Sequence, residues 1–258
     1  MLEIERAVCG CAYGGTSWTT RDEADRIAQH LRLRPGMRLL DVGAGSGWPG
    51  LYLARITGCD VALVDIPLEG LRIAARRAIT EPITGACWVM AADGAAMPLR
   101  SAGFDAIGHS DVLCCLEAKG SVLAECRRVI RADGTMVFTV ISITPGLSAA
   151  DYQRALQAGP LFKDAGAGYP ALLEQTGWRV TQHVDLSLEY ASRARHMLRE
   201  EEAHADALAR LFGEAEFSDM LDRRRGTVQA LDCGLLQRAL FAAVPAAGLR
   251  GGISLPPS

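Results

Sequence analysis

Short apolar runs alternate with amphipathic stretches along the first 145 residues of this chain. Apolar runs bounded by Gly, Pro or Asp are typical of buried strands in a parallel sheet, whereas apolar residues at helical spacing indicate helices. Five strands are predicted in this way, at Met37–Val42, Asp60–Asp65, Cys87–Ala91, Phe104–His109 and Thr135–Ser142. Strands that alternate with helices predict a doubly wound α/β sheet.

Capping and stop signals place the helices between these strands. Thr20 and Glu23 have the spacing of a capping box, which predicts a helix over about Arg21–Leu33. A second helix is expected over Leu68–Ile79, and the stripe of apolar residues at 122–130 predicts a third, ended by Arg131–Gly134.

Beyond residue 146 the regular alternation stops. Helices are predicted over Ala149–Phe162 and Ala171–Thr176, a strand over Trp178–Leu188, a long amphipathic stretch over 189–232 and a closing strand over Leu235–Val244. The Gly/Pro tail 248–258 is expected to be frayed. The predicted architecture is a Rossmann-like, doubly wound, seven-stranded and mostly parallel sheet with helical lid insertions. It forms a single domain, 1–258, made of an N-terminal flap and helix (1–36), a cofactor-binding core (37–145) and lid insertions (146–168 and 189–232).

Composition narrows the class of protein. The net charge is −3 and the pI about 6.0, so no basic field exists for a nucleic-acid backbone. No run of eighteen apolar residues predicts a membrane span, and the N-terminus carries charges unlike those of a signal peptide. Eight cysteines without a leader favour reduced thiols and a cytoplasmic location. Cys9-x-Cys11 and Cys114-Cys115 lack zinc spacing, so no metal site is predicted.

A glycine-rich turn follows the first strand, at the position where open α/β sheets bind ligands. Glycines there let the backbone approach a nucleotide-like ligand closely. Two motifs overlap in this turn. Gly45-x-Gly-x-x-Gly50, with Asp65 twenty residues after Gly45, fits a dinucleotide fingerprint. Asp41-x-Gly43-x-Gly45-x-Gly47 instead places a carboxylate before three alternate glycines.

Charge separates the two readings. A carboxylate such as Asp41 at the mouth of the turn would repel a pyrophosphate but favour a sulfonium and an ammonium. Asp65, at the end of the second strand, suits two ribose hydroxyls, and Asp93 at the end of the third suits an adenine amine. Acidic residues at the ends of three successive strands therefore favour a cationic adenosyl ligand.

These segments resemble an ordered set of motifs of the class I S-adenosylmethionine-dependent methyltransferases. Leu39–Gly47 resembles motif I, Phe104–Leu113 the strand-four motif, and Arg127–Met136 the segment that enters strand five, with Ala132-Asp133 in place of Pro-Gly. The resemblance implies methyl transfer from S-adenosylmethionine and a cofactor site in which Asp65 binds the ribose, Ile66 packs on the adenine and a Ser110 carbonyl faces the ammonium. The full predicted cofactor set is Asp41, Gly43, Ala44, Gly45, Gly47, Trp18, Asp65, Ile66, Asp93, Gly94 and Ser110.

The reaction needs mostly positioning, with a base only where the acceptor must lose a proton. His109, at the end of strand four, is the candidate base, and Tyr13 is the second catalytic candidate. Tyr13 and Trp18 are expected in a flap over the cofactor, and Asp111 is expected to cap the following helix. Candidate acceptor-lining residues are Phe162, Tyr169, Tyr190 and Met197.

The expected acceptor is a small molecule, because strand four lacks the Asp/Asn-Pro-Pro-aromatic signature of DNA amino-methyltransferases and the chain is acidic. Three alternatives stay open: an NAD-dependent oxidoreductase, a catalytically inactive methyltransferase-like binding module, and a thiol- or metalloid-methylating enzyme that uses Cys114 and Cys115. The sequence leaves open whether O, N, C or S is methylated, and it allows a homodimer.

Overall fold

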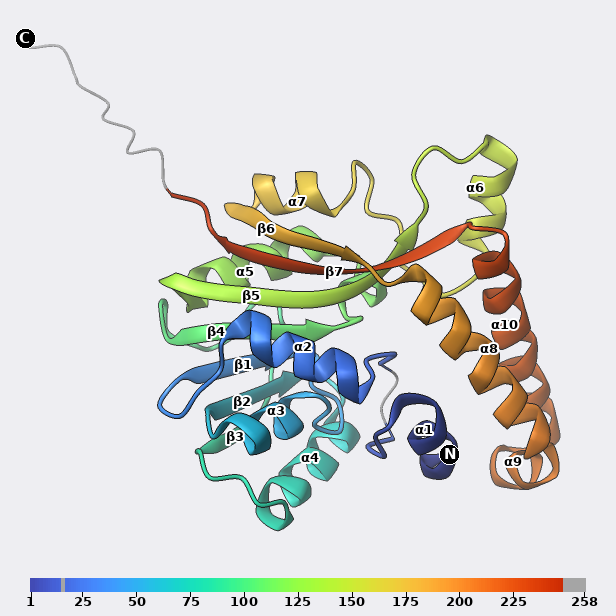
Figure 1. Cartoon of the computed structure of the whole chain (residues 1–258), viewed down its shortest axis with the longest axis horizontal. Helices are drawn as coiled ribbons and strands as arrows, with labels where there is room; N and C mark the ends of the chain where they lie inside the picture. The colour runs from blue at the N-terminus through green and yellow to red at the C-terminus, as the bar shows by residue number, and fades with distance from the viewer. Residues whose placement is uncertain (15–16, 248–258) are drawn as a thin grey trace, which may run out of the picture.

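A twisted sheet of seven strands runs through the computed structural model, which describes residues 1–14 and 17–247 (Figure 1). The strand order is β3-β2-β1-β4-β5-β7-β6, and β7 runs antiparallel to both of its neighbours. The strands are β1 (Arg38–Val42), β2 (Asp60–Asp65), β3 (Cys87–Ala91), β4 (Phe104–Ser110), β5 (Ile130–Ile143), β6 (Trp178–Asp185) and β7 (Leu236–Pro245). The predicted seven-stranded, mostly parallel α/β fold is therefore confirmed.

Helices cover both faces of the sheet and extend beyond its carboxyl edge (Figure 1). They are α1 (Leu2–Cys9), α2 (Arg21–Leu31), α3 (Gly50–Thr57), α4 (Leu68–Thr80), α5 (Lys119–Val129), α6 (Ala149–Leu156), α7 (Tyr169–Gln175), α8 (Ser187–Ala203), α9 (Ala205–Phe212) and α10 (Glu214–Asp232), with a 3-10 turn η1 at Leu113–Cys115. Within the described part of the chain, no helix has the length and apolar character needed to cross a membrane.

The predicted capping box is present at the start of α2. The Thr20 hydroxyl accepts a hydrogen bond from the Glu23 N–H, and the Glu23 carboxylate accepts one from the Thr20 N–H. Two apolar clusters lie on opposite faces of the sheet, one under α5 and α7 and the other under α2 and α3. The central strands are buried from both sides, which explains their continuous apolar sequence.

Two local expectations were wrong, and one helix was missed. Strand β5 begins at Ile130 and not at Thr135, so Arg131–Gly134, which were expected to end the preceding helix, lie within the strand. The helix expected to reach residue 162 ends at Leu156, because Gly159 adopts a left-handed conformation and Pro160 follows it. Helix α1 was not anticipated. It buries Ile4 and Val8 on its inner side and packs against α8. The expected fraying of 248–258 lies outside the described residues.

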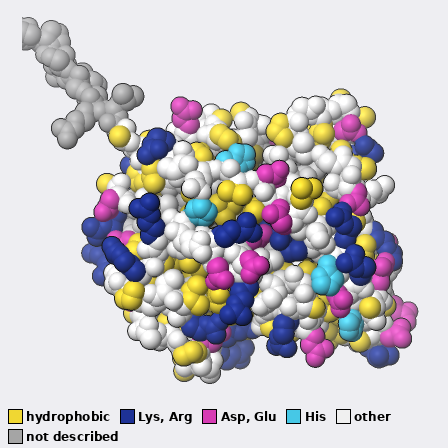
Figure 2. All heavy atoms as spheres, viewed as in Figure 1, with side chains coloured by type: hydrophobic (Ala, Val, Ile, Leu, Met, Phe, Trp, Pro, Cys, Tyr) yellow, Lys and Arg dark blue, Asp and Glu magenta, His cyan; other side chains and the backbone are white. Residues whose placement is uncertain are grey.

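Charged side chains of both signs are interspersed over the face seen in Figure 2. This distribution agrees with the net charge of −3. A surface of this kind offers no continuous basic stripe on that face for a phosphate backbone.

Candidate active site

The glycine turn between β1 and α3 lies at the carboxyl edge of the sheet. Gly43, Gly45 and Gly47 all have positive φ, at 72°, 50° and 103°. A Cβ on Gly43 would come within 2.4 Å of Val112, and one on Gly47 within 2.4 Å of Leu51. A Cβ on Gly45 would meet nothing closer than Asp65 Oδ2, at 4.0 Å. Packing thus requires glycine at two positions, whereas Gly45 leaves space beside its Cα for a ligand.

Asp65 connects the end of β2 to this turn. One carboxylate oxygen accepts from the Gly45 N–H at 2.7 Å, and the other accepts from the Ile66 N–H at 2.7 Å. A carboxylate has about four lone-pair sites, so both oxygens can still accept from hydroxyl groups of a ligand. The Ile66 side chain is 61% exposed beside it and presents an apolar surface to the same edge.

Asp41 lies beneath the turn and not at its mouth. Its side chain is buried, and its carboxylate accepts from the Gly50 N–H at 3.0 Å. A Cβ on Gly50 would come within 2.5 Å of this carboxylate, so the third glycine of the alternative motif serves close packing of α3 on the strand. Burial raises the pKa of Asp41 to about 7.

The loops after β3 and β4 complete the edge. Asp93 is exposed, and one of its oxygens accepts from the Ala95 N–H at 2.8 Å. Gly94 packs tightly, since a Cβ there would lie 3.1 Å from Val42. Ser110 ends β4, is buried, and its hydroxyl has no hydrogen-bond partner among the described residues. The predicted cofactor residues of the four strand ends therefore gather at one edge.

His109, the candidate base, lies next to Ser110 but points to the other side of β4. Its ring is 1% exposed and stacks on Phe138 of β5, with 4.5 Å between centroids. Neither ring nitrogen has a hydrogen-bond partner within residues 1–14 and 17–247. Burial lowers the pKa of His109 to about 3, so the imidazole is neutral at physiological pH.

The N-terminal strap, residues 10–14 and 17–20, crosses from the glycine turn to β4. The Tyr13 carbonyl accepts from the Ser46 hydroxyl and from Arg77, both at 2.7 Å, and the Tyr13 hydroxyl donates to Glu81. Burial raises the pKa of Tyr13 above its usual range. Tyr13 thus contacts the outer side of the glycine turn, and its hydroxyl is bound to Glu81 and not to His109.

Trp18 lies at the other end of the strap. Its backbone N–H donates to the Asp111 carboxylate at 3.0 Å. Its ring packs edge to face with the ring of Tyr190 of α8, with 5.0 Å between the centroids. The Arg224 guanidinium of α10 lies 4.8 Å from the Trp18 ring. These three side chains border a cavity of about 210 Å³ beneath the helical insertion. Of the other residues expected near an acceptor, Met197 packs into the apolar cluster beneath α2 and α3.

A buried network of four charges joins the strap to the sheet and to α8. Arg238 of β7 is fully buried and donates to both oxygens of Asp111, at 2.9 and 3.0 Å, and to both oxygens of Glu23, at 3.0 Å each. Arg193 of α8 also pairs with Glu23. Burial would raise the pKa of Asp111, but Arg238 lowers it below its ordinary value.

The interpretation of Asp111 as a helix cap was therefore wrong. Its carboxylate binds Arg238 and the strap, and its backbone adopts φ 57°, unusual for a residue other than glycine. Sequence reasoning missed the network. An arginine inside the apolar run Leu236–Val244 was the one available signal, because a buried guanidinium requires carboxylate partners.

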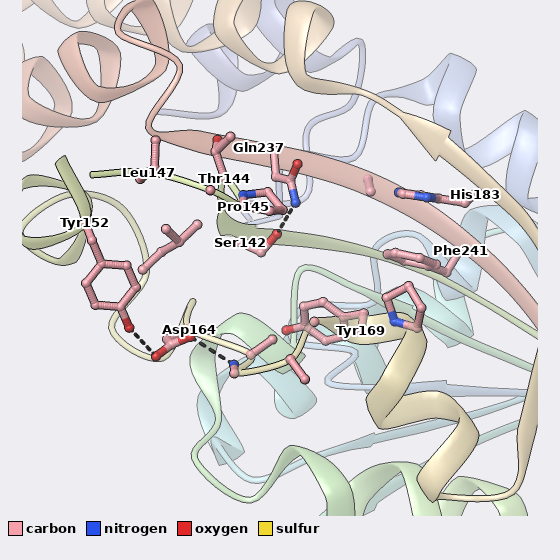
Figure 3. A pocket seen from close by; sticks show the side chains of 18 residues that line it. Ser142, Thr144, Pro145, Leu147, Tyr152, Asp164, Tyr169, His183, Gln237 and Phe241 are labelled. Carbon is pink, nitrogen blue, oxygen red and sulfur yellow. Dashed lines mark hydrogen bonds between the residues drawn. The ribbon is translucent and has the colours of Figure 1, made fainter. Parts of the chain in front are cut away.

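A cavity lies where β5 and β7 meet the loop before α7. This β5–β7 cavity has a volume of about 530 Å³. Figure 3 shows its side chains converging from both strands, from α6 and from the 164–170 loop. The polar and aromatic lining consists of Ser142, Tyr152, Asp164, Tyr169, His183, Gln237 and Phe241. Tyr169, one of the four residues predicted to line an acceptor site, belongs to this lining.

The thiols of Cys114 and Cys115 both lie against the Asp111 carbonyl, at 3.2 and 3.5 Å. Cys114 is buried and Cys115 exposed. The adjacent Cys114 thiol lowers the pKa of Cys115 to about 7. In the part of the chain that the structure describes, no group of three or more His, Cys, Asp or Glu side chains could hold a metal ion.

Several of the known proteins that this chain resembles are methyltransferases. Residues 40–138 match the model of a family described as a methyltransferase domain. Methyltransferase GfsG of Streptomyces halstedii is 26% identical over 169 residues, which are 63% of this chain and 60% of that protein. The chain thus spans less than two thirds of that relative, and it spans 48% of a 24-methylenesterol C-methyltransferase from Oryza sativa.

Solved structures share the fold. A putative sarcosine dimethylglycine methyltransferase from Galdieria sulphuraria has a TM-score of 0.78 at 17% identity, covering 88% of this chain and 84% of that one. A Haemonchus contortus phosphoethanolamine N-methyltransferase, solved with phosphomonomethylethanolamine and S-adenosylhomocysteine, has a TM-score of 0.79 at 14% identity. It covers 95% of this chain and 57% of that one.

Proposed function

We propose that this chain, which belongs to the class I S-adenosylmethionine-dependent methyltransferases, transfers the methyl group of that cofactor to a small-molecule acceptor. The family match to residues 40–138 and the methyltransferases among its relatives support this activity. The bound cofactor would supply a sulfonium methyl group that an acceptor nucleophile could attack in line, with the neutral thioether as the leaving group. The protein's own residues then have to bind, orient and exclude water.

The arrangement of Gly45 and Asp65 carries the proposal. The carboxylate of Asp65 holds the open backbone of Gly45 in place at 2.7 Å, and lone pairs of the same carboxylate remain for the two ribose hydroxyls. Gly43, Ala44 and Gly47 shape the turn, with Asp41 buried beneath it. The exposed Ile66 would pack on the adenine. We further propose Asp93 and Gly94 for the adenine edge, Ser110 for the ammonium end, and Trp18 as part of the cover.

Topology favours this cofactor over a dinucleotide. A dinucleotide-binding sheet has the strand order 3-2-1-4-5-6 with parallel strands, whereas here the antiparallel β7 is inserted between β5 and β6. Gly50 of the alternative fingerprint is in contact distance of Asp41 and is not open to a pyrophosphate. The two acidic strand ends at Asp65 and Asp93 also suit a cationic ligand better than an anionic one.

We propose His109 as a neutral hydrogen-bonding partner near the reacting groups and not as a strong base. Both ring nitrogens lack hydrogen-bond partners among the residues described, and a pKa of about 3 makes the imidazole a weak proton acceptor. For Tyr13, whose hydroxyl is held by Glu81, we propose a supporting role through the strap and the Ser46 contact. Both were candidate catalytic residues, and both assignments stay proposals.

The helical insertion is proposed to act as a lid. Helices α8 and α10 pack side by side beyond the carboxyl edge of the sheet, and both contact Trp18 (Figure 1). The segment 146–168 borders the β5–β7 cavity and is included in the lid.

A homodimer and a cytoplasmic location are proposed as well. The second is supported by all eight cysteines being free thiols, and light scattering tests the first.

Calorimetric titration with S-adenosylhomocysteine tests the proposal, with NAD titrated in parallel. Wild-type protein is expected to bind the first ligand and not NAD. Asp65→Ala is expected to lose about 1–3 kcal/mol of binding free energy, since ribose hydrogen bonds to a charged partner disappear. Asp60→Ala, at the opposite end of the same strand, is the matched control and should bind like wild type. Binding of NAD alone would overturn the assignment, and absence of both would favour an inactive module.

A further inference from the structure

Four aromatic side chains form a row across the sheet from β4 to β6. The residues are paired directly in register, His109 with Phe138, Phe138 with Phe241, and Phe241 with His183. Their rings stack at centroid distances of 4.5, 5.3 and 4.4 Å. Because neighbouring rings face one another at these distances, the row is an aromatic stack, and its ring edges form a floor that begins beside the proposed methyl-transfer site and ends at the β5–β7 cavity.

Tyr169 stands over this floor. Its ring centroid lies 6.0 Å from those of both Phe138 and Phe241. The residue is 2% exposed, yet its hydroxyl finds no hydrogen-bond partner among the residues that the structure describes. Figure 3 shows that hydroxyl pointing into the cavity, toward the side where Ser142 and Asp164 lie. A buried hydroxyl without a partner is costly, so this position indicates a ligand that completes the hydrogen bond.

The polar groups of the wall define the charge of that ligand. Asp164 accepts from the Tyr152 hydroxyl at 2.5 Å and from the Gly166 N–H at 2.9 Å. Gln237 donates to the Ser142 hydroxyl at 3.1 Å. Among the described lining residues there is no lysine or arginine. The charge of Lys119, which lies outside the lining, helps to lower the pKa of Asp164. The Lys119 ammonium donates to the Leu116 carbonyl at 2.8 Å.

The cavity is also tied to the end of β4. The Phe162 N–H donates to the Cys114 carbonyl at 3.0 Å, which fastens the loop before α7 to the turn that follows Asp111. A volume of about 530 Å³ is within the range of drug-sized ligand pockets. Aromatic walls with a few polar groups are the usual composition of such pockets.

We propose that the β5–β7 cavity holds the body of the methyl acceptor, and that this acceptor is a largely apolar ring compound without negative charge. The inference rests on the proposed function, since it names the acceptor class for that reaction. The acceptor ring packs against the Phe241 and His183 side chains and exchanges a hydrogen bond with the Tyr169 hydroxyl. An acidic acceptor would meet the Asp164 carboxylate, with no lysine or arginine among the described lining residues to offset it.

The experiment uses two fluorescent probes of the same ring size, 2-naphthol and 2-naphthoate. Each is titrated into full-length protein with and without saturating S-adenosylhomocysteine. We expect 2-naphthol to bind in both conditions and 2-naphthoate to bind at least tenfold more weakly. Tyr169→Phe should weaken 2-naphthol about five- to tenfold, the loss of one hydrogen bond. Ala167→Trp, at an exposed lining position, should abolish binding by filling the cavity.

Tyr52→Phe is the matched control, because its hydroxyl donates to Asp25 outside the cavity. It should leave 2-naphthol binding unchanged, and thermal melting checks that every variant is folded. Unchanged 2-naphthol affinity in Tyr169→Phe and Ala167→Trp, displacement by S-adenosylhomocysteine, or equal affinity for 2-naphthoate would each overturn the inference. If S-adenosylhomocysteine binds normally in those cases, the proposed function stands. Failure of that ligand to bind would instead count against the proposed function.

Discussion

Arg238→Met is expected to destabilise the protein strongly. The guanidinium is fully buried and makes two hydrogen bonds to Asp111 and two to Glu23, whose side chains are 5% and 0% exposed. Methionine is unbranched and fills part of the same space, but it is shorter and carries no charge. The substitution therefore leaves two buried carboxylates without their main cation. Removing one partner of a buried ion pair typically costs about 3–5 kcal/mol.

Urea and thermal unfolding followed by circular dichroism measure this effect. For a domain of this size each kcal/mol shifts Tm by about 2–4 °C, so the melting temperature should fall by roughly 6–20 °C. Arg225→Met in α10 is the matched control. Its side chain is 52% exposed and pairs with Glu202 and Asp222, so its loss should cost less than about 1 kcal/mol.

A triple variant separates the charge argument from simple loss of packing. When Glu23→Gln and Asp111→Asn accompany Arg238→Met, no unpaired carboxylate remains next to residue 238, and much of the lost stability should return. The reasoning is refuted if Arg238→Met costs no more than the exposed control. A triple variant less stable than the single one would show that the network contributes net stability beyond compensating its own burial.

Further predictions concern the glycine turn and two buried titratable groups. Gly47→Ala should lower Tm, because the new Cβ would lie 2.4 Å from Leu51 at φ 103°. Gly45→Ala should lower Tm less than Gly47→Ala does, but it should weaken the binding of S-adenosylhomocysteine. Equal Tm losses in the two variants would contradict the assignment. In the folded state His109 has a pKa of about 3, below its value in the unfolded state. Between pH 6.5 and about 3 the unfolded state therefore binds a proton at this residue and the folded state does not. His109→Gln should therefore gain stability relative to wild type by up to about 1.4 kcal/mol per pH unit as the pH falls from 6.5, measured by urea unfolding at a series of pH values. Asp41, with a folded pKa of about 7, holds a proton between pH 4 and 7 that the unfolded chain releases, so wild-type stability should fall as pH rises through that window. Asp41→Asn should remove that slope, and a variant with the wild-type slope would show that Asp41 is ionised in the fold.

Local sequence determined the elements of the core and their order. The apolar runs of β1 to β4, the glycine turn and the Thr20–Glu23 capping box depend on contacts within a few residues, so they could be predicted without the fold. The positions of Asp65 and Asp93 followed as well, because parallel strands of a doubly wound sheet end at the same edge.

Tertiary structure alone decided where the polar side chains of this edge point. Asp41 lies under the turn because α3 packs on β1, and Asp111 binds an arginine that is 127 residues away in sequence. The aromatic row from His109 to His183 depends on the register of four strands, two of which come from the last third of the chain. Sequence spacing determines what lies on one helix face or strand, but it carries no record of which distant strands pair. For that reason the gathering of the parallel strand ends at one edge was predictable, whereas the buried charge network and the β5–β7 cavity were not.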